Sequence, residues 1–254
     1  MKVVVFDDDG LMGVETALWV QDHGYEVRLV PAPGGPHSPA PTPTSDEMAE
    51  TLDGCAVMVH LAPAPAPRHT LSWLRATGEL LRAGAAAGVR HHVCLSAVGA
   101  DRITGGVFPA LKAREALLQR SGTPYSVLRA TQTYEAAEDI ADAGTEDWIV
   151  WVPPAEVRPV SLTDVAILLA HTAVSRPLHG VLEIAGPEQF GLDAFVRTAL
   201  RAETEYRRVR TDPRSPFYGA RLRLLDLLPG AGARIARTTY REWLTGRPAP
   251  DTRP

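Results

Sequence analysis

Several residue types on which particular kinds of site depend are scarce in this chain. Of its 254 residues only two are cysteines, Cys55 and Cys94, and both lie in apolar runs typical of strands. A free cysteine in such a run behaves as a small hydrophobic residue, which favours a reducing cytoplasm over a disulfide framework. No pattern of metal ligands surrounds either cysteine, so we expect no metal site and a cytoplasmic location.

Long apolar runs and an excess of positive charge are also missing. No apolar run approaches the roughly 18 residues of a membrane span, and the N-terminus enters a strand without a basic leader. The formal net charge is -4, and the arginines are spread along the chain. This balance gives no electrostatic case for binding nucleic acid or an anionic membrane. We expect a small-molecule partner and a monomer or homodimer.

The apolar content predicts an α/β fold. The chain is 45% hydrophobic and 22% charged, enough to bury a large core. Short apolar runs alternate with helical patterns, and right-handed crossovers between them favour a doubly wound parallel sheet. We predict strands over residues 1–6, 25–30, 55–61, 91–96 and 125–129, with helices over 46–52, 70–87 and 109–119 and a first helix that ends at Gly24.

Beyond Thr131 the pattern is less regular. We predict strands over residues 157–160 and 181–184, helices over 164–173 and 192–201, and a basic terminal element over 231–243. We therefore divide the chain into a doubly wound domain, residues 1–133, and a C-terminal part, residues 134–254. That part completes the sheet and forms a small substrate-binding lobe.

Three aspartates, Asp7, Asp8 and Asp9, follow the first strand, where a dinucleotide-binding protein holds its phosphate-cradling glycines. In that motif one glycine permits the turn, one lets the backbone approach a pyrophosphate, and one allows close helix packing. Only Gly10 and Gly13 remain. A carboxylate ~5 Å from one phosphate charge costs ~3 kcal/mol at an effective dielectric near 20. We expect impaired NAD(P) binding at the degenerate motif, which consists of Gly10, Leu11, Met12 and Gly13.

The aspartates also have a structural interpretation. Acidic residues at a helix start cap it and favour its dipole, and Asp9 suits that role. Capping accounts for one aspartate better than for three. Two further alternatives are that the side chains turn outward or that the cofactor binds in a shifted pose. After the second strand, Pro31-Ala32-Pro33 supplies neither the arginine nor the carboxylate that holds an adenosine ribose or phosphate.

Five segments resemble the NmrA-like branch of the atypical short-chain dehydrogenases/reductases. They are residues 89–101, 111–118, 121–132, 158–166 and 183–188. The resemblance implies a Rossmann-type domain with a small C-terminal substrate lobe. It also implies relatives that include NAD(P)H-dependent quinone or ketone reductases and nonenzymatic redox sensors. Many short-chain reductases carry Tyr-x-x-x-Lys; here Phe108 and Lys112 stand at those positions, and phenylalanine cannot protonate a carbonyl oxygen.

The candidate catalytic residues are Lys112, Ser96, His60 and Asp7. Lys112 is one of only two lysines, and the resemblance places it beside the substrate, where its ammonium could polarise a carbonyl or stabilise an enolate. Its structural alternative is an exposed lysine paired with Glu115. By the same resemblance Ser96 lies near the substrate, and its alternative is a serine that caps the next turn.

His60 ends the third strand, so it could reach the aspartates at residues 7–9. A raised imidazole pKa there would give an acid/base pair with Asp7, although a histidine at a strand end is more often simply hydrogen-bonded. His91 and His92 stand at the N-terminal end of the fourth strand, opposite the expected site, and we discount them as catalytic residues. The candidate substrate-binding residues are Gln132, Tyr134, Glu135, Trp148 and Trp151, with the two tryptophans as an aromatic wall or, alternatively, as core.

These observations support three hypotheses of function. The first is a tailoring enzyme for a small, natural-product-like molecule, such as an aromatic polyketide or quinone, that performs cofactor-independent isomerisation, cyclisation or elimination. The second is an NAD(P)H-dependent quinone or carbonyl oxidoreductase. The third is a nonenzymatic NmrA-like regulatory or binding protein.

Overall fold

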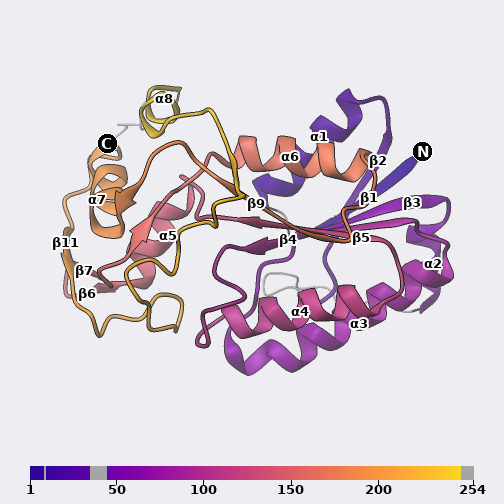
Figure 1. The fold of residues 1–254 in the computed structure, drawn as a ribbon, viewed down its shortest axis with the longest axis horizontal. Coiled ribbons are helices and arrows are strands. Elements are labelled where there is room, and N and C mark those ends of the chain that lie inside the picture. The colour runs from indigo at the N-terminus through magenta and orange to yellow at the C-terminus, as the bar shows by residue number, and fades with distance from the viewer. Residues whose placement is uncertain (9, 35–44, 247–254) are drawn as a thin grey trace, which may run out of the picture.

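A computed structural model describes residues 1–8, 10–34 and 45–246 (Figure 1). Its main feature is a seven-stranded sheet in which every neighbouring pair is parallel. The strand order is β12 (Arg234–Ile235), β9 (Gly180–Ala185), β5 (Tyr125–Ala130), β4 (His91–Ala97), β3 (Cys55–His60), β1 (Lys2–Asp7) and β2 (Glu26–Pro31). The mixed α/β, Rossmann-type architecture is confirmed.

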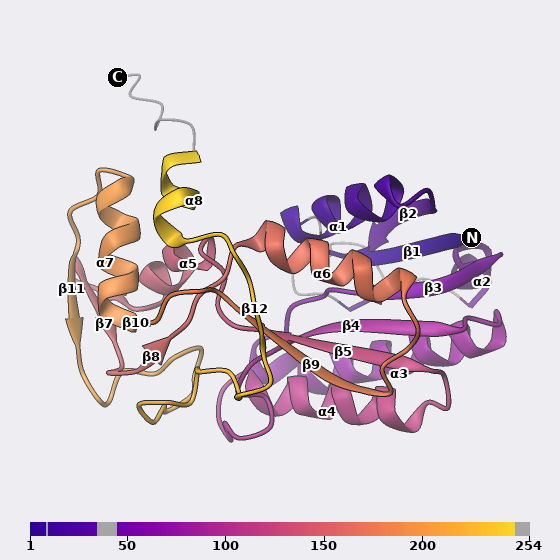
Figure 2. The same ribbon diagram turned by 45° about the horizontal axis from the view of Figure 1, so that its top comes forward.

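Helices cover both faces of this sheet, as Figures 1 and 2 show. One face carries α1 (Leu11–Asp22) and α6 (Leu162–Val174). The other face carries α2 (Ser45–Leu52), α3 (Thr70–Ala86) and α4 (Phe108–Arg120). A short 3-10 turn, η1 (Pro67–His69), precedes α3. All six residues of β3 are buried, as expected of a parallel strand covered on both sides. The central strands β1, β3, β4 and β5 are therefore largely buried, although each also carries polar residues.

The order of the strands locates a ligand crevice. Both β2 and β3 pair with β1, so the sheet is built outward in two directions from β1. Open α/β sheets bind ligands outside the carboxyl ends of the strands at such a switch point. The carboxyl ends of β1 and β3 carry Asp7 and His60, which places both residues beside the expected crevice.

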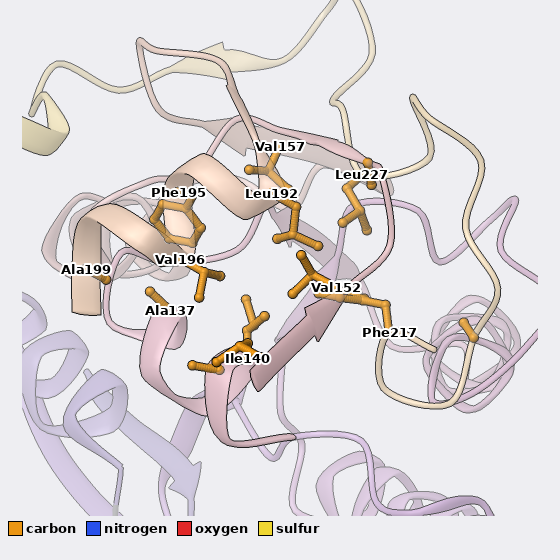
Figure 3. Close-up of a cluster of buried hydrophobic side chains, with 14 of the residues drawn as sticks. Ala137, Ile140, Val152, Val157, Leu192, Phe195, Val196, Ala199, Phe217 and Leu227 are labelled. Atoms are coloured by element: carbon orange, nitrogen blue, oxygen red, sulfur yellow. The ribbon is translucent and has the colours of Figure 1, made fainter. Parts of the chain in front are cut away.

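A smaller lobe packs beyond the carboxyl ends of the main strands. It contains α5 (Ala136–Ala143), α7 (Leu192–Ala202), α8 (Tyr240–Gly246), a three-stranded sheet of β11 (Arg208–Thr211), β7 (Ile149–Val152) and β6 (Thr145–Glu146), and the pair β8 (Glu156–Val157) and β10 (Phe190–Gly191). Its core is aliphatic and aromatic: Figure 3 shows Ile140 of α5, Val152 of β7 and Phe195 of α7 facing one another.

The sequence predicted the main sheet better than the lobe. The predicted strand over residues 157–160 is wrong in extent: the structure has β8 at Glu156–Val157 and only an isolated bridge from Val160 to Thr133. Pro159 has no N–H to donate and interrupts the ladder. The predictions also missed α5 and β11. Within the described residues no helix is long and apolar enough to cross a membrane.

Candidate functional site

The turn between β1 and α1 turns one aspartate inward. Asp7 is 6% exposed, and its Oδ2 accepts a hydrogen bond of 2.8 Å from the backbone N–H of Gly13. Gly10 is the N-cap residue of α1, so Gly13 is its third helical residue. The first N–H groups of a helix lack partners within the helix and favour an anion. The Asp7 carboxylate is that anion.

The same carboxylate fills the space above the two remaining glycines. A Cβ added at Gly10 would lie 2.9 Å from Asp7 Oδ2, and one added at Gly13 would overlap that oxygen. In a phosphate-binding turn this space, at the helix N-terminus, receives the pyrophosphate. The side chains present therefore do not fit a pyrophosphate in its usual position.

Burial gives Asp7 an altered titration. Desolvation raises its pKa above the ordinary value, and the charge of neighbouring Asp8 adds to this, while the N–H groups of Asp8, Gly13 and Gly10 act against it. The predicted cap, Asp9, lies outside the described residues. The N-cap position belongs to Gly10, which makes no side-chain capping bond, and Asp7 satisfies the Gly13 N–H instead.

His60 corrects one of our expectations. The residue is fully buried, and burial, aided by the positive charge of Arg114, lowers its pKa well below the usual 6.5. Our prediction of a raised pKa for the imidazole of His60 is therefore wrong. His60 instead stacks on His92 with ring centroids 6.0 Å apart, and neither imidazole has a hydrogen-bond partner among the described residues.

A buried arginine lies beside these histidines. Arg114 of α4 is 1% exposed, donates to the carbonyl oxygen of Ala62 at 2.6 Å and to that of Leu95, and stacks over Trp73 of α3 at 4.7 Å. Arg114 thus joins the segment after β3 to β4. Nothing in the sequence indicated this role.

Ser96 belongs to a buried ion network. Its hydroxyl donates to Glu115 at 2.6 Å, and Arg129 binds both oxygens of Glu115 at 2.9 and 2.6 Å. Arg129 also contacts Asp101 at 3.1 Å and Glu183 at 3.9 Å. The parallel register explains the cluster, because Ser96, Arg129 and Glu183 pair side by side on β4, β5 and β9. A charged residue inside an apolar strand was the available sequence signal for Arg129.

Lys112 is exposed on α4, and its Nζ lies 3.5 Å from the backbone carbonyl oxygen of Asp101. The pairing with Glu115 that we considered does not form, because Arg129 takes that carboxylate. Phe108, one turn earlier, is 2% exposed and packs in the core of the lobe. Lys112 therefore presents an ammonium group at the surface of the helix without a carboxylate bound to it among the described ion pairs.

The residues after β5 lie together near the start of α6. Glu135 accepts hydrogen bonds from the indole of Trp243 at 2.8 Å and from the Leu162 N–H at 3.2 Å. Burial raises its pKa, and the charge of Glu15 on α1 acts in the same direction. Gln132 has a buried carbonyl oxygen without a partner among the described atoms. This group therefore combines a protonatable carboxyl with an unused acceptor.

Tyr134 is unsuited to proton transfer. It is fully buried and donates to the carbonyl of Thr238 at 2.8 Å. Burial, with Glu188 and Asp164 nearby, raises its pKa above the usual 10. The two tryptophans do not form one wall: Trp148 is 82% exposed beside Tyr206, whereas Trp151 lines a different cavity with Phe217.

The segment after β2, where a dinucleotide-binding protein holds the adenosine, offers no polar side chain at residues 31–33. The backbone N–H of Ala32 is used by Asp7 O at 3.0 Å, and Ala32 itself is buried. Neither Ala32 nor its neighbours Pro31 and Pro33 has a side chain that could hold a ribose or phosphate.

Within the part of the chain that the structure describes, no group of three or more His, Cys, Asp or Glu is placed to hold a metal ion.

Solved structures with a similar backbone identify the fold. The chain matches MoeE5 in complex with UDP-glucose and NAD with a TM-score of 0.69 and 18% identity, covering 96% of each chain. It matches the *Escherichia coli* NADPH-dependent quinone oxidoreductase QOR2 complexed with NADPH with a TM-score of 0.63 and 16% identity, over 84% of this chain and 78% of that one. These matches show that the chain shares the Rossmann-type fold of these proteins.

A third match extends this group. The *Citrobacter* sp. triphenylmethane reductase complexed with NADP(H) aligns with a TM-score of 0.60 and 13% identity, over 85% of this chain and 80% of that one. No protein-family model matches the chain, and no curated protein matches it in sequence. The likeness to known proteins therefore rests on the fold alone.

Proposed function

We propose that this chain is a small-molecule enzyme on the atypical short-chain reductase scaffold that works without a nicotinamide cofactor. The observation that carries the proposal is the Asp7 carboxylate, which occupies the pyrophosphate position and binds Gly13 N at 2.8 Å. A bound dinucleotide would have to displace this internal anion and tolerate Asp8 next to it.

The remaining groups suit proton transfer better than hydride transfer. The Lys112 ammonium can stabilise an oxyanion that develops on a carbonyl or enol substrate. Glu135 has a raised pKa and can take up or release a proton nearer neutral pH than an ordinary carboxyl. Lys112 lies on α4 and Glu135 lies near the start of α6, and each group taken separately is of a type used in isomerisation, cyclisation or elimination of a carbonyl compound. The substrate class we propose, an aromatic polyketide-like or quinone-like molecule, comes from the resemblance of the sequence.

Titration calorimetry with NADPH and NADH tests this proposal. We expect no heat of binding at micromolar cofactor concentrations, and no oxidation of NADPH in the presence of simple quinones. A dissociation constant in the micromolar range together with quinone-dependent oxidation of NADPH would contradict the proposal.

The second candidate is an NAD(P)H-dependent quinone or carbonyl oxidoreductase. It is favoured by the strand, turn and helix retained at β1 and α1 and by structural neighbours solved with NADPH, NADP(H) or NAD. It predicts quenching of tryptophan fluorescence on addition of NADPH.

A nonenzymatic binding role is the third candidate, favoured by the structural use of Ser96 in the ion network. Under that role, Lys112→Met leaves every measurable property of the protein unchanged. An enzyme that uses Lys112 loses turnover in Lys112→Met and keeps part of it in Lys112→Arg, which retains the charge.

A further inference from the structure

A cavity of about 170 Å³ lies inside the C-terminal lobe. It is bounded by α5, β7 and residues 216–219, and Ile140, Val152 and Phe217 are among the side chains that line it (Figure 3). A cavity of about 150 Å³ with aliphatic and aromatic walls holds one benzene molecule. The cavity in this lobe is partly open to solvent and has room for at least one six-membered ring.

The walls of the cavity are uncharged. None of the described residues that line it is Lys, Arg, His, Asp or Glu, and the polar side-chain groups are the Trp151 indole and the Tyr218 hydroxyl. An ionised ligand would lose its hydration there without gaining a partner. Burial, together with the charge of Asp139, raises the pKa of Tyr218 to about 12, so its hydroxyl keeps its proton at neutral pH.

Tyr218 occupies a backbone position that disfavours tyrosine. Phe217 and Ala220 exchange backbone hydrogen bonds of 2.8 and 2.9 Å, which closes a two-residue hairpin turn. The turn residues Tyr218 and Gly219 have φ of 46° and 82°. Such turns usually contain Asn, Asp or Gly, and a bulky residue there is strained. Backbone strain of this kind gathers at ligand clamps, so the turn alone does not account for an aromatic ring at this position.

The hairpin is fixed against the first lobe. A Cβ added at Gly106 would overlap the carbonyl oxygen of Tyr218 and would lie 2.7 Å from Ala220 N. Gly106 belongs to the loop between β4 and α4, which contains Asp101 and leads to Lys112. This close packing fixes the backbone of the hairpin next to the segment that carries the candidate lysine. The Tyr218 residue is 39% exposed, and its ring packs edge-on against the ring of Phe217, with centroids 4.8 Å apart.

We propose that this cavity binds one uncharged aromatic ring of a small molecule, with the Tyr218 hydroxyl hydrogen-bonded to a hydroxyl or carbonyl group on that ring. The site is separate from the β1–α1 turn and does not depend on whether a nicotinamide cofactor binds there.

The experiment is fluorine NMR of the full chain with 4-fluorophenol as the probe, and with 4-fluorobenzoate for comparison. We expect 4-fluorophenol to bind, and the charged probe to bind at least about tenfold more weakly. Tyr218→Gly removes the ring and relieves the strained φ, so its melting temperature should stay close to that of the wild type while the affinity falls by about tenfold or more.

Two further variants make the assignment specific. Tyr218→Phe keeps the ring and loses the hydroxyl, so its affinity should lie between those of the wild type and Tyr218→Gly. Tyr206→Ala removes another tyrosine, 87% exposed in a different hollow, and should bind 4-fluorophenol as the wild type does. The proposal fails if the wild type does not bind 4-fluorophenol, if Tyr218→Gly binds it unchanged, or if 4-fluorobenzoate binds equally well.

Discussion

The side chain of Arg129 forms ion pairs with three carboxylates. Its guanidinium neutralises Glu115, whose side chain is only 4% exposed, and it also contacts Asp101 and Glu183. A carboxylate buried this deeply without its cation is costly, because it can regain neither water nor charge compensation. At the residue scale, this contact holds the carboxylate of Glu115, which in turn accepts a hydrogen bond from the hydroxyl of Ser96.

Replacing Arg129 should destabilise the fold strongly. We expect Arg129→Met to lower the free energy of unfolding by about 3–5 kcal/mol, measured by urea denaturation, because Glu115 is left as an uncompensated buried charge. Arg75→Met, which removes the exposed Arg75–Glu79 pair, is the matched control and should change little. Equal losses of unfolding free energy in Arg129→Met and Arg75→Met would show that the buried ion network stabilises the fold no more than an exposed ion pair does.

The residue scale also shows what the sequence could and could not predict about the site. The three aspartates in the first turn were visible in the sequence, and an unusual phosphate site followed from them. The sequence could not show that Asp7 turns inward onto Gly13, because that depends on the helix start and on tertiary burial. His60 was mispredicted for the same reason: a strand end beside the crevice can still face the interior.

At the scale of elements, glycines set how closely β9 approaches the segment before α6. A Cβ at Gly186 would overlap the carbonyl oxygen of Pro159, and Arg158 binds the Gly186 carbonyl oxygen at 2.8 Å. The two backbones are thus held together by direct contact. Gly186 follows β9 of the main sheet, and Pro159 follows β8 of the lobe. This contact therefore helps to join the end of the main sheet to the lobe.

Substitution of Gly186 should separate these elements. We expect Gly186→Ala to lower the free energy of unfolding by about 1–3 kcal/mol through forced backbone movement, read from thermal or urea unfolding. The control is Gly78→Ala in α3, where an added Cβ meets nothing within 4 Å. It should stabilise the protein by about 0.5–1 kcal/mol, because alanine favours a helix interior. A destabilisation by Gly78→Ala as large as that by Gly186→Ala would contradict this interpretation.

Element predictions succeeded where the sequence had long apolar periods. The central strands β1, β3 and β4 are almost entirely buried, so their apolar runs were unambiguous. The two-residue edge strand β12 is exposed, and the sequence did not indicate it. The helix α5, by contrast, has only eight residues and gains its stability from packing against α7 and β7. The edge strand β11 reads as alternating arginines, Arg208 and Arg210, and a polar alternation gives little indication of a strand.

At the scale of the whole molecule, buried histidines make the fold sensitive to acid. Burial lowers the pKa of His92 to about 3 and that of His91 to about 4, against 6.5 for an exposed imidazole. The unfolded chain therefore binds more protons than the folded chain between about pH 6.5 and pH 3. The stability contributed by these neutral imidazoles is fully present above pH 6.5 and is lost as the pH falls through that window.

Removing one of these histidines should flatten the dependence of stability on pH. We expect His92→Met to reduce the slope of unfolding free energy by about 1.4 kcal/mol per pH unit between pH 4 and 6, measured by urea denaturation at each pH. The raised pKa values of Asp7 and Glu135 act in the opposite sense, and comparison of the two proteins cancels them. An unchanged slope would show that His92 is already protonated in the folded state.

The Asp7 carboxylate lies at the N-terminus of α1, in the space where a dinucleotide-binding protein holds the pyrophosphate. We propose that it prevents a nicotinamide cofactor from binding there. The most direct measurement is calorimetric titration of NADPH into the wild type and into Asp7→Gly, which restores a glycine and empties the space above Gly13. We predict that the wild type does not bind NADPH at micromolar concentrations and that Asp7→Gly binds NADPH at least about tenfold more tightly than the wild type. Micromolar binding by the wild type, unchanged or weakened in Asp7→Gly, would contradict it.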